Sequence, residues 1–425
     1  MKQDSEIIRI VQNEIDNAEY QSVTDMDQAM SYYSLAARGD EIEGRSQVQS
    51  ADVADMVESI TAQIMPAFKG TDIGQFEAVF PGDEQQAQVE STMVNYLFMD
   101  RANGYMKIQE AVRDALMFRN CIIKCYVLDR VNIITEMYED LTDEDMFVLE
   151  QQAPPNHELS YEVFDDGVVL KRKVVTKTLE ICCVPPEEFL YSNDWNSINI
   201  EDCPFTAHHR TILRTDLIEM GYDPAVVNEL QRGQQSGQND YIRSNTKLYD
   251  TNSSISDRSL DPIEIYECYI NVDANEDGFA ELRKIVIAGN NTILENEEVQ
   301  FHAFAAGAAI MFPHRFKAVS IYDKAKDVQD SKTFILRQYM DNLNTMNNRR
   351  LEADMTSVID PNDLVESRPG GVIKVRKLGA IREIEHSDIG PSCMNALGYW
   401  DKIRTERCGA SMDMQSENMP VNPET

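Results

Sequence analysis

The stretch that decides the fold runs AVSIYDKAKDVQDSKTFILRQYMDNLNTMNNRR from Ala318 to Arg350 and contains neither proline nor glycine. Apolar residues recur in it at spacings of three, four or seven, which places them on one face of an α-helix. This apolar seam consists of Ile321, Ala325, Val328, Ile335, Tyr339, Leu343 and Met346. The pattern predicts one helix of roughly 30 residues and some 45 Å. Such a helix exceeds the usual globular length and suggests packing against similar helices.

The residues that follow complete a helix–strand–helix pattern. Residues 352–388 are mostly polar, and within them Pro369-Gly370-Gly371 opens the β-like run Val372-Ile373-Lys374-Val375. A second helix is predicted from near Pro391 to about Cys408, because proline is favoured in the first turn of a helix. We therefore expect a small β insertion between two helices.

The first 300 residues favour helices at the start and strands later. Helical spacing of apolar residues recurs as far as residue 118, and the β-branched run 121–128 predicts a buried strand. Turn residues at 165–167 and between runs 263–272 and 281–288 predict two hairpins. Residues 231–262, rich in Gln, Ser, Asn and Asp, predict a flexible loop. The fold class is therefore α+β.

Composition and charge exclude several classes of protein. The chain has 425 residues and a hydrophobic fraction of 42%, enough for two to four domains of roughly 100–200 residues. Its net charge of −34 argues against a protein that binds nucleic acid tightly, because binding phosphate requires clustered cations. The longest apolar run, residues 304–312, is about half of the roughly 20 residues that span a bilayer, so no membrane partner is expected. The eight cysteines are too sparse for a disulfide framework and predict reduced thiols.

No sequence motif indicates catalysis or a bound cofactor. Phosphate-binding glycine loops, a nucleophile elbow and an H-E-x-x-H helix do not occur in the sequence. The segment from Asp273 through Asn275 and Asp277 matches the start of a calcium loop, but Lys284 stands where a bidentate glutamate is required. A polar hairpin tip is the favoured interpretation, and we expect no metal, no cofactor and no enzymatic activity. The competing classes are an acidic interaction scaffold and, less favoured, a metal-dependent nuclease that uses some of the 73 acidic residues.

One region departs from the acidic character of the chain. Residues 315–383 contain thirteen Lys and Arg against ten Asp and Glu, a balance of +3. Its β insertion carries Arg368, Lys374, Arg376, Lys377 and Arg382, which are candidates for contact with DNA in a channel or with an acidic partner. A solvated strand edge protected by cations is an equally good interpretation.

Several segments, in a shared order over residues 44–410, resemble the portal (head-to-tail connector) proteins of short-tailed double-stranded DNA phages. The segments are residues 44–48 (GRSQV), 184–190 (VPPEEFL), 207–210 (AHHR), 215–217 (TDL), 273–281, 313–316 (PHRF), 369–373 (PGGVI) and 404–410 (RTERCGA). None is a catalytic signature, and their order makes the resemblance specific.

The resemblance implies a ring, usually of twelve subunits, at one capsid vertex of the virion, assembled in the host cytoplasm. It divides the chain into an α/β wing (residues 1–312), a first stem helix (313–349), a small β-containing clip (350–388), a second stem helix (389–408) and the start of a tunnel loop (409–425). Such portals continue beyond the tunnel loop, so we expect that the chain shown lacks those C-terminal elements. The apolar seam would then lie at the subunit interface.

The resemblance also implies partners. They are the terminase motor, the head-to-tail adaptor, the major capsid and scaffolding proteins, and double-stranded DNA that passes through without sequence-specific contacts. Twelve copies at −34 would carry −408. An acidic channel wall binds DNA weakly, so the duplex can slide.

Overall fold

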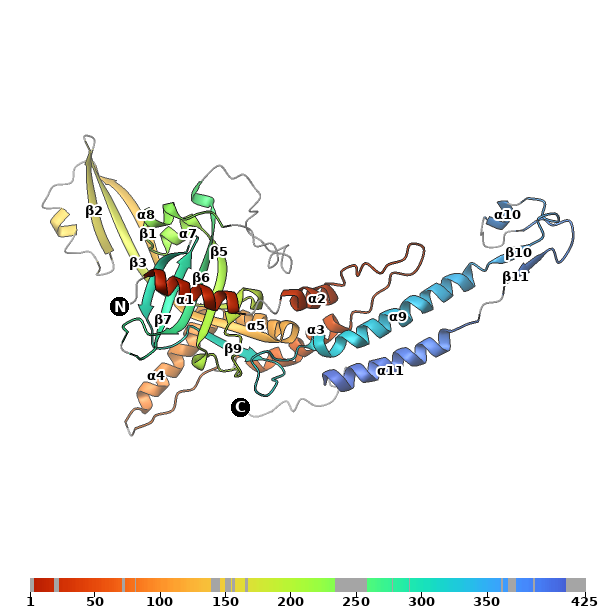
Figure 1. Cartoon of the computed structure of the whole chain (residues 1–425), viewed down its shortest axis with the longest axis horizontal. Helices are drawn as coiled ribbons and strands as arrows, with labels where there is room; N and C mark the ends of the chain where they lie inside the picture. The colour runs from red at the N-terminus through yellow and green to blue at the C-terminus, as the bar shows by residue number, and fades with distance from the viewer. Residues whose placement is uncertain are drawn as a thin grey trace. The chain divides into compact units, whose positions relative to one another are not determined.

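The computed structural model describes residues 4–18, 23–70, 73–80, 82–138, 146–149, 154, 157–164, 167–233, 258–276, 278–289, 291–360, 362–365, 372–384 and 387–409. The chain divides into two compact units (Figure 1). The first unit consists of residues 1–28 and 61–320, and the second of residues 29–60 and 321–425. The chain is a mixture of helix and strand, as the sequence predicts.

The first unit contains two antiparallel sheets. The five-stranded sheet has the order β4-β5-β6-β7-β8, so each strand pairs with its neighbour in the sequence. Its strands are β4 (Phe189–Tyr191), β5 (Phe205–Leu213), β6 (Pro262–Val272), β7 (Glu281–Ala288) and β8 (Thr292–Glu298). The pairing of β6 with β7 confirms the second predicted hairpin.

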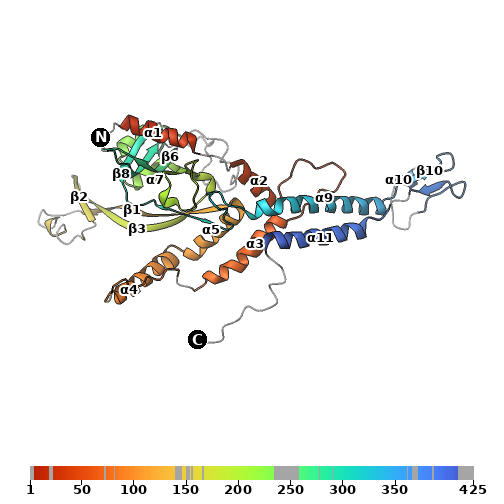
Figure 2. The same ribbon diagram turned by 60° about the horizontal axis from the view of Figure 1, so that its bottom comes forward.

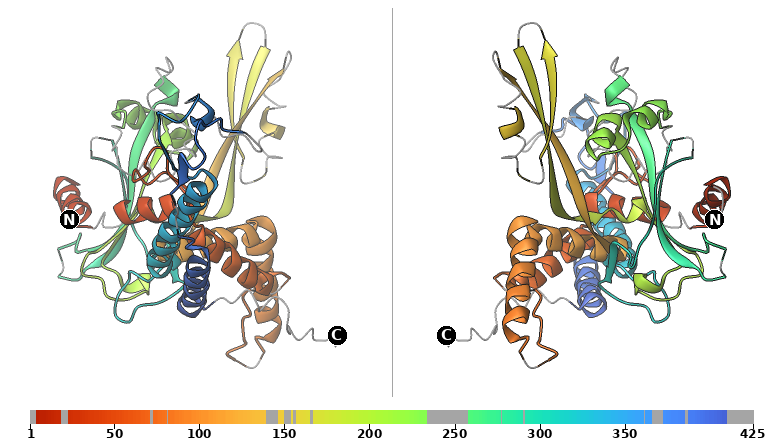
Figure 3. Two further views of the ribbon diagram at one scale, coloured as in Figure 1. Left: turned by 90° about the vertical axis from the view of Figure 1, so that its right-hand side faces the viewer. Right: turned by 90° about the vertical axis from the view of Figure 1, so that its left-hand side faces the viewer.

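The second sheet of this unit has four strands in the order β2-β3-β1-β9. They are β1 (Asn120–Tyr138), β2 (His157–Phe164), β3 (Gly167–Val184) and β9 (Phe304–Ala308). β2 and β3 form the first predicted hairpin, while β1 is much longer than the predicted strand 121–128. Figure 3 shows β1, β2 and β3 extending as a ribbon beyond the other strands.

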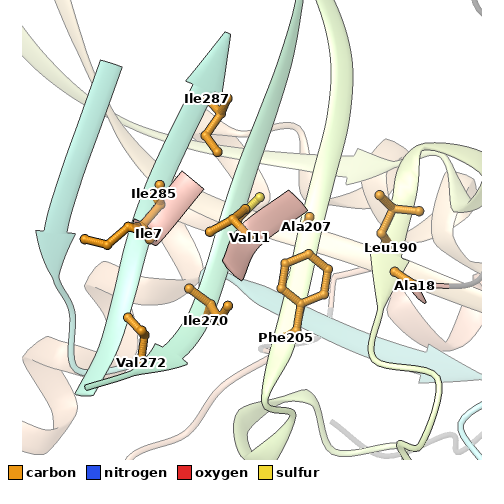
Figure 4. Close-up of a cluster of buried hydrophobic side chains, with 11 residues drawn as sticks. Ile7, Val11, Ala18, Leu190, Phe205, Ala207, Ile270, Val272, Ile285 and Ile287 are labelled. Atoms are coloured by element: carbon orange, nitrogen blue, oxygen red, sulfur yellow. The ribbon is translucent and has the colours of Figure 1, made fainter. Parts of the chain in front are cut away.

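Helices cover both faces of the five-stranded sheet. On one face, Ile7 and Val11 of α1 pack over Phe205, Ile270 and Ile285, as Figure 4 shows. On the other face, Leu217 and Val227 pack with strand residues such as Ile263 and Val286. Side chains alternate between the two faces along each strand, so β6 and β7 supply both cores. The helices of this unit are α1 (Asp4–Asn17), α4 (Glu84–Asn95), α5 (Gly104–Phe118), α7 (Arg214–Glu219) and α8 (Pro224–Glu229).

Short helical turns connect these elements. They are the 3-10 turns Met65–Phe68, Pro186–Glu188, Ile200–Asp202 and Arg258–Leu260, and the π-helical segment Tyr96–Arg101 between α4 and α5. Most of the predicted loop 231–262 lies outside the described residues, as do residues 165 and 166.

The second unit is built on two long helices, α9 (Ile321–Asn347) and α11 (Gly390–Cys408). Between them lie β10 (Leu351–Ala353), α10 (Asn362–Val365) and β11 (Ile381–Glu383), with β10 and β11 paired antiparallel. The predicted helix–strand–helix pattern is therefore confirmed, but the predicted β-like run 372–375 is not a strand. Of that run only Val375 pairs, in an isolated β-bridge with Val358, because the regular pairing of the insertion forms between 351–353 and 381–383 instead. The segments of α2 (Val23–Ser34) and α3 (Asp52–Ile64) that fall in residues 29–60 also belong to this unit.

This division differs from the domain boundaries expected from the sequence, which placed residues 29–60 in the wing. The physical reason is a set of hydrogen bonds to α9. Gln329, which is buried, accepts from the backbone N–H of Val53 at 2.9 Å and donates to the carbonyl of Tyr32 at 3.2 Å. The assignment of the names wing, stem, clip and tunnel loop to these segments stays a prediction.

Candidate functional site

The helix pair α9–α11 and the strands between them form the candidate site. α9 has 27 residues and therefore a length of about 40 Å at 1.5 Å per residue. α11 begins with Pro391 in its first turn and ends at Gly409, whose positive φ of 73° terminates the helix. Figures 1 and 2 both show the two helices side by side, and the intervening β10–β11 hairpin makes them antiparallel.

A buried charge cluster ties α3, α9 and α11 together. The carboxylate of Asp52 is fully buried and accepts hydrogen bonds from Lys332 Nζ at 2.6 Å and Arg404 Nη1 at 2.9 Å. Ser50 Oγ donates to the same carboxylate at 2.6 Å. Lys332 also contacts Asp401, at 2.8 Å. We call Ser50, Asp52, Lys332, Asp401 and Arg404 the charge clasp.

The clasp keeps its central carboxylate ionised. Burial alone would raise the pKa of Asp52, but the hydrogen bonds from Lys332 and Ser50, with the nearby positive charges, hold that pKa below its usual value. Two cations and one hydroxyl satisfy a carboxylate that would otherwise be costly to bury. The clasp therefore ties three helices together with charge, in addition to the buried apolar residues of α3 and α9.

The structure divides the apolar seam of α9 into two parts. Ile321, Ala325 and Val328 are buried within the chain itself, so in this conformation they offer no surface to another subunit. The other four seam residues are partly exposed, and their place at a subunit interface stays a prediction. They are Ile335, Tyr339, Leu343 and Met346.

The helix pair also exposes apolar side chains that lie off the seam, which the sequence analysis missed. Phe334 of α9 is 62% exposed and Tyr399 of α11 is 64% exposed, and Met340 and Met394 are exposed as well. Phe334 precedes the seam residue Ile335 by one position, a rotation of about 100° around the helix. Asking which large apolar residues fall outside the seam would have identified it.

The segment between the helices presents cations together with apolar side chains. Lys374, Arg376, Lys377 and Arg382 are all exposed, whereas Arg368 lies outside the described residues. Leu378 is 94% exposed beside them, and Val372 and Met355 are exposed as well. Arg382 stands opposite Glu352 in the β10–β11 pair. This surface combines positive charge with apolar area, as docking surfaces for proteins do.

The calcium-like segment is organised as a turn. Asp273 accepts hydrogen bonds from the backbone N–H groups of Glu276, at 2.7 Å, and Gly278, at 3.0 Å. Asn275 donates to Glu281, and Asp277 lies outside the described residues. Both carboxylate oxygens of Asp273 are therefore engaged by amides of the turn itself.

Two other kinds of site do not occur among the described residues. No cluster of three or more His, Cys, Asp or Glu side chains that could hold a metal occurs within the ranges given above. Among those same residues, no helix combines the length and apolar character needed to cross a bilayer. All eight cysteines are free thiols.

Comparison with known proteins identifies the family. No curated protein matches the chain. The family model described as the phage SU10 portal protein matches residues 7–419, nearly the whole chain. The match spans the helix pair, the charge clasp and both sheets of the first unit. The chain therefore belongs to the family of the phage SU10 portal protein.

Proposed function

We propose that about twelve copies of this chain form a closed ring at one vertex of the phage head, through which double-stranded DNA enters during packaging and leaves during ejection. The family supports the portal role. One observation supports the ring: the α9–α11 pair is held together internally by the charge clasp yet leaves large apolar side chains exposed.

The exposed apolar residues of the helix pair supply contacts for neighbouring subunits. Phe334 and Met340 lie on α9, and Met394 and Tyr399 lie on α11. When two different surfaces of one subunit meet on adjacent copies, repetition of the contact closes a ring if the rotation per subunit allows it. The partly exposed seam residues extend the same contact along α9.

The charge of the chain suits a channel that does not retain DNA. With 73 acidic and 39 basic residues per subunit, the ring repels the phosphate backbone on most of its surface. Weak attraction to phosphate lets the duplex move, because no counterions are released on contact. The energy for movement comes from a separate motor, the terminase.

The basic, apolar segment between α9 and α11 is the proposed docking surface for that motor and later for the head-to-tail adaptor. Lys374, Arg376, Lys377 and Arg382 would meet acidic partner surfaces, and Leu378 would supply apolar contact. The sheets of the first unit would face the major capsid and scaffolding proteins. In this proposal the chain assembles in the host cytoplasm and remains at the vertex of the virion.

Native mass spectrometry and negative-stain imaging of the purified chain, with and without its scaffolding protein, test the ring. We expect a species of about twelve times the 48.4 kDa chain mass, with a central hole. Phe334→Asp should abolish that species, whereas the control Gln338→Ala, one turn further on the exposed side of α9, should retain it. A monomer under both conditions, or an open polymer, would refute the ring.

A further inference from the structure

In the first unit, exposed apolar side chains are concentrated on one arm. The arm consists of residues 73–80 and α4 with its following tyrosine, residues 82–96. Its exposed residues include Phe76, Val79, Phe80, Val89, Met93 and Tyr96. Figures 1 and 2 show α4 standing clear of both sheets.

Within the arm, polar side chains of α4 bond to residues 73–80, whereas the apolar side chains are exposed to solvent. Asn95 accepts from the backbone N–H groups of Ile73 and Gly74, at 2.8 and 3.1 Å, and Ser91 accepts from that of Phe76 at 2.8 Å. These bonds hold the preceding segment, residues 73–80, along one face of α4. The arrangement is the reverse of an ordinary surface helix, whose apolar face turns inward.

The opposite face of α4 is a stripe of exposed apolar residues. Val89, Met93 and Tyr96 follow at intervals of four and three and therefore share one side of the helix. Val79, on the segment before α4, is 83% exposed. Covering Phe76, Phe80 and Tyr96 alone would remove on the order of 300 Å² from water. Patches of this size on soluble proteins mark interaction sites.

The charge of the arm limits what can cover it. Residues 73–96 contain four acidic residues, Glu77, Asp83, Glu84 and Glu90, and no Lys or Arg. A matching surface must therefore be apolar and free of acids, with at least one cation available to pair.

The first unit carries such a surface on a loop between β9 and α9. We call residues 310–319 the bridged loop, because Ile310 and Val319 pair as a β-bridge at its base. Met311 is 68% exposed in it, and Phe312 is exposed beside Arg315, whose guanidinium lies 5.2 Å from the centre of the phenyl ring. Residues 299–322 contain no Asp or Glu, although the chain has 73.

Arg315 is the cation that the arm requires. It is exposed, and among the described residues no carboxylate lies within ion-pair distance of it. Its neighbour Lys317, by contrast, is paired with Asp25 at 3.2 Å. An arginine stacked on an aromatic ring within an apolar surface is typical of the residues that dominate protein interfaces.

We propose that the arm of one subunit packs on the bridged loop of the next subunit. This inference rests on the proposed ring and adds a second, head-to-tail contact within the first unit. The apolar stripe of α4 covers Met311 and Phe312, and a carboxylate of the arm, Glu90 beside Val89, pairs with Arg315. Because the two surfaces differ, the contact repeats from copy to copy.

Two variants of the full chain test this pairing. Val89→Lys with Met93→Lys damages the arm while keeping good helix formers, and Met311→Ser with Phe312→Ser damages the loop. All four side chains are exposed, so the isolated subunit should fold as before. Phe279→Ser, at a phenylalanine in the β6–β7 turn that is more exposed than Phe312, is the matched control.

We expect the wild type and the control to form rings and each variant alone to remain monomeric by native mass spectrometry. Mixing the two variants leaves one intact arm and one intact loop per pair, so a species of twice the 48.4 kDa chain mass should appear and grow no further. Rings from either variant, with rings from the wild type, would overturn the pairing and leave the proposed function standing. A wild type that stays monomeric, with or without scaffolding protein, would overturn both.

Discussion

Replacing Asp52 with asparagine should destabilise the second unit by about 3 kcal/mol. The substitution keeps the size of the side chain but removes the charge that Lys332 and Arg404 share. Removing one partner of a buried ion pair costs about 3–5 kcal/mol, because the remaining charge is left without compensation. We expect the lower end of that range, since Asp401 still lies 2.8 Å from Lys332 and 3.6 Å from Arg404.

The two tryptophans make the measurement specific to one unit. Trp195 lies in the first unit and Trp400 on α11 in the second. In a Trp195→Phe background, urea unfolding followed by tryptophan fluorescence therefore reports on the second unit alone. Lys402→Ala, which removes an exposed pair with Glu406 on the same helix, should change the free energy of unfolding by less than about 0.5 kcal/mol.

A double variant and a pH series complete the test. Asp52→Asn with Lys332→Met should cost less than Asp52→Asn alone, because one of the two orphaned cations is then gone. Since the pKa of Asp52 is lowered in the fold, its contribution is present above the unfolded value of about 3.9 and is lost as the pH falls through the folded value. A loss below about 1 kcal/mol for Asp52→Asn, or an equal loss for Lys402→Ala, would show that the clasp does not hold the helices.

Three further outcomes are expected. Lys374→Glu with Lys377→Glu should leave the ring intact and abolish capture of the terminase in a pull-down, because the docking surface changes sign; undiminished capture would refute the docking assignment. In the first unit, Glu267→Gln breaks a buried pair with Lys124 and should cost about 3 kcal/mol or more, read from Trp195 in a Trp400→Phe background. Burial lowers the pKa of His208, so protonation of this side chain opposes folding, and the stability of the first unit should fall as the pH drops below about 6.5. His208→Gln should flatten that pH dependence in the same fluorescence assay. An unchanged slope would contradict the role given to His208.

The parts of the fold that could be predicted from sequence are those in which apolar residues recur at a regular spacing within one helix or one hairpin. α9 and α11 were recognisable because apolar spacing and proline and glycine at the ends act within one helix. The β6–β7 hairpin was recognisable from two alternating runs around a polar turn. β1 was predicted too short because beyond residue 128 it is stabilised mainly by pairing with β3, and such pairing leaves no continuous apolar run in the sequence.

The placement of residues 29–60 in the second unit could not be predicted, because polar contacts determine it and the residues that make them do not recur at a regular spacing in the sequence. Asp52 is one of 73 acidic residues, and nothing in its neighbourhood marks it as the one that becomes fully buried. Its partners Lys332 and Arg404 are 280 and 352 residues away. The candidate docking cations were accessible to sequence reasoning, since clustered charge in an acidic chain is a local signal. The exposed stripe of α4 was not, because sequence alone does not reveal which face of a helix remains uncovered.

The distribution of charge and apolar area makes a prediction about salt. Inside the second unit the helices are tied by buried charges, which salt screens poorly, while the proposed contacts between subunits are largely apolar. Each subunit carries −34, so neighbouring subunits repel one another at low ionic strength. Raising the salt shortens the screening length from about 30 Å at 0.01 M to about 8 Å at 0.15 M and removes most of that repulsion.

Ring assembly should therefore increase as potassium chloride is raised over that range, while unfolding of the second unit, followed through Trp400, changes little. The single pair between Arg315 and the arm weakens with salt, but it is one contact among several apolar ones and cannot reverse the trend. Mass photometry at fixed protein concentration gives the fraction in rings. Rings that dissociate as salt increases would mean that ion pairs, and not apolar contacts, hold neighbouring subunits together, and both the α9–α11 surface and the arm would then be assigned wrongly.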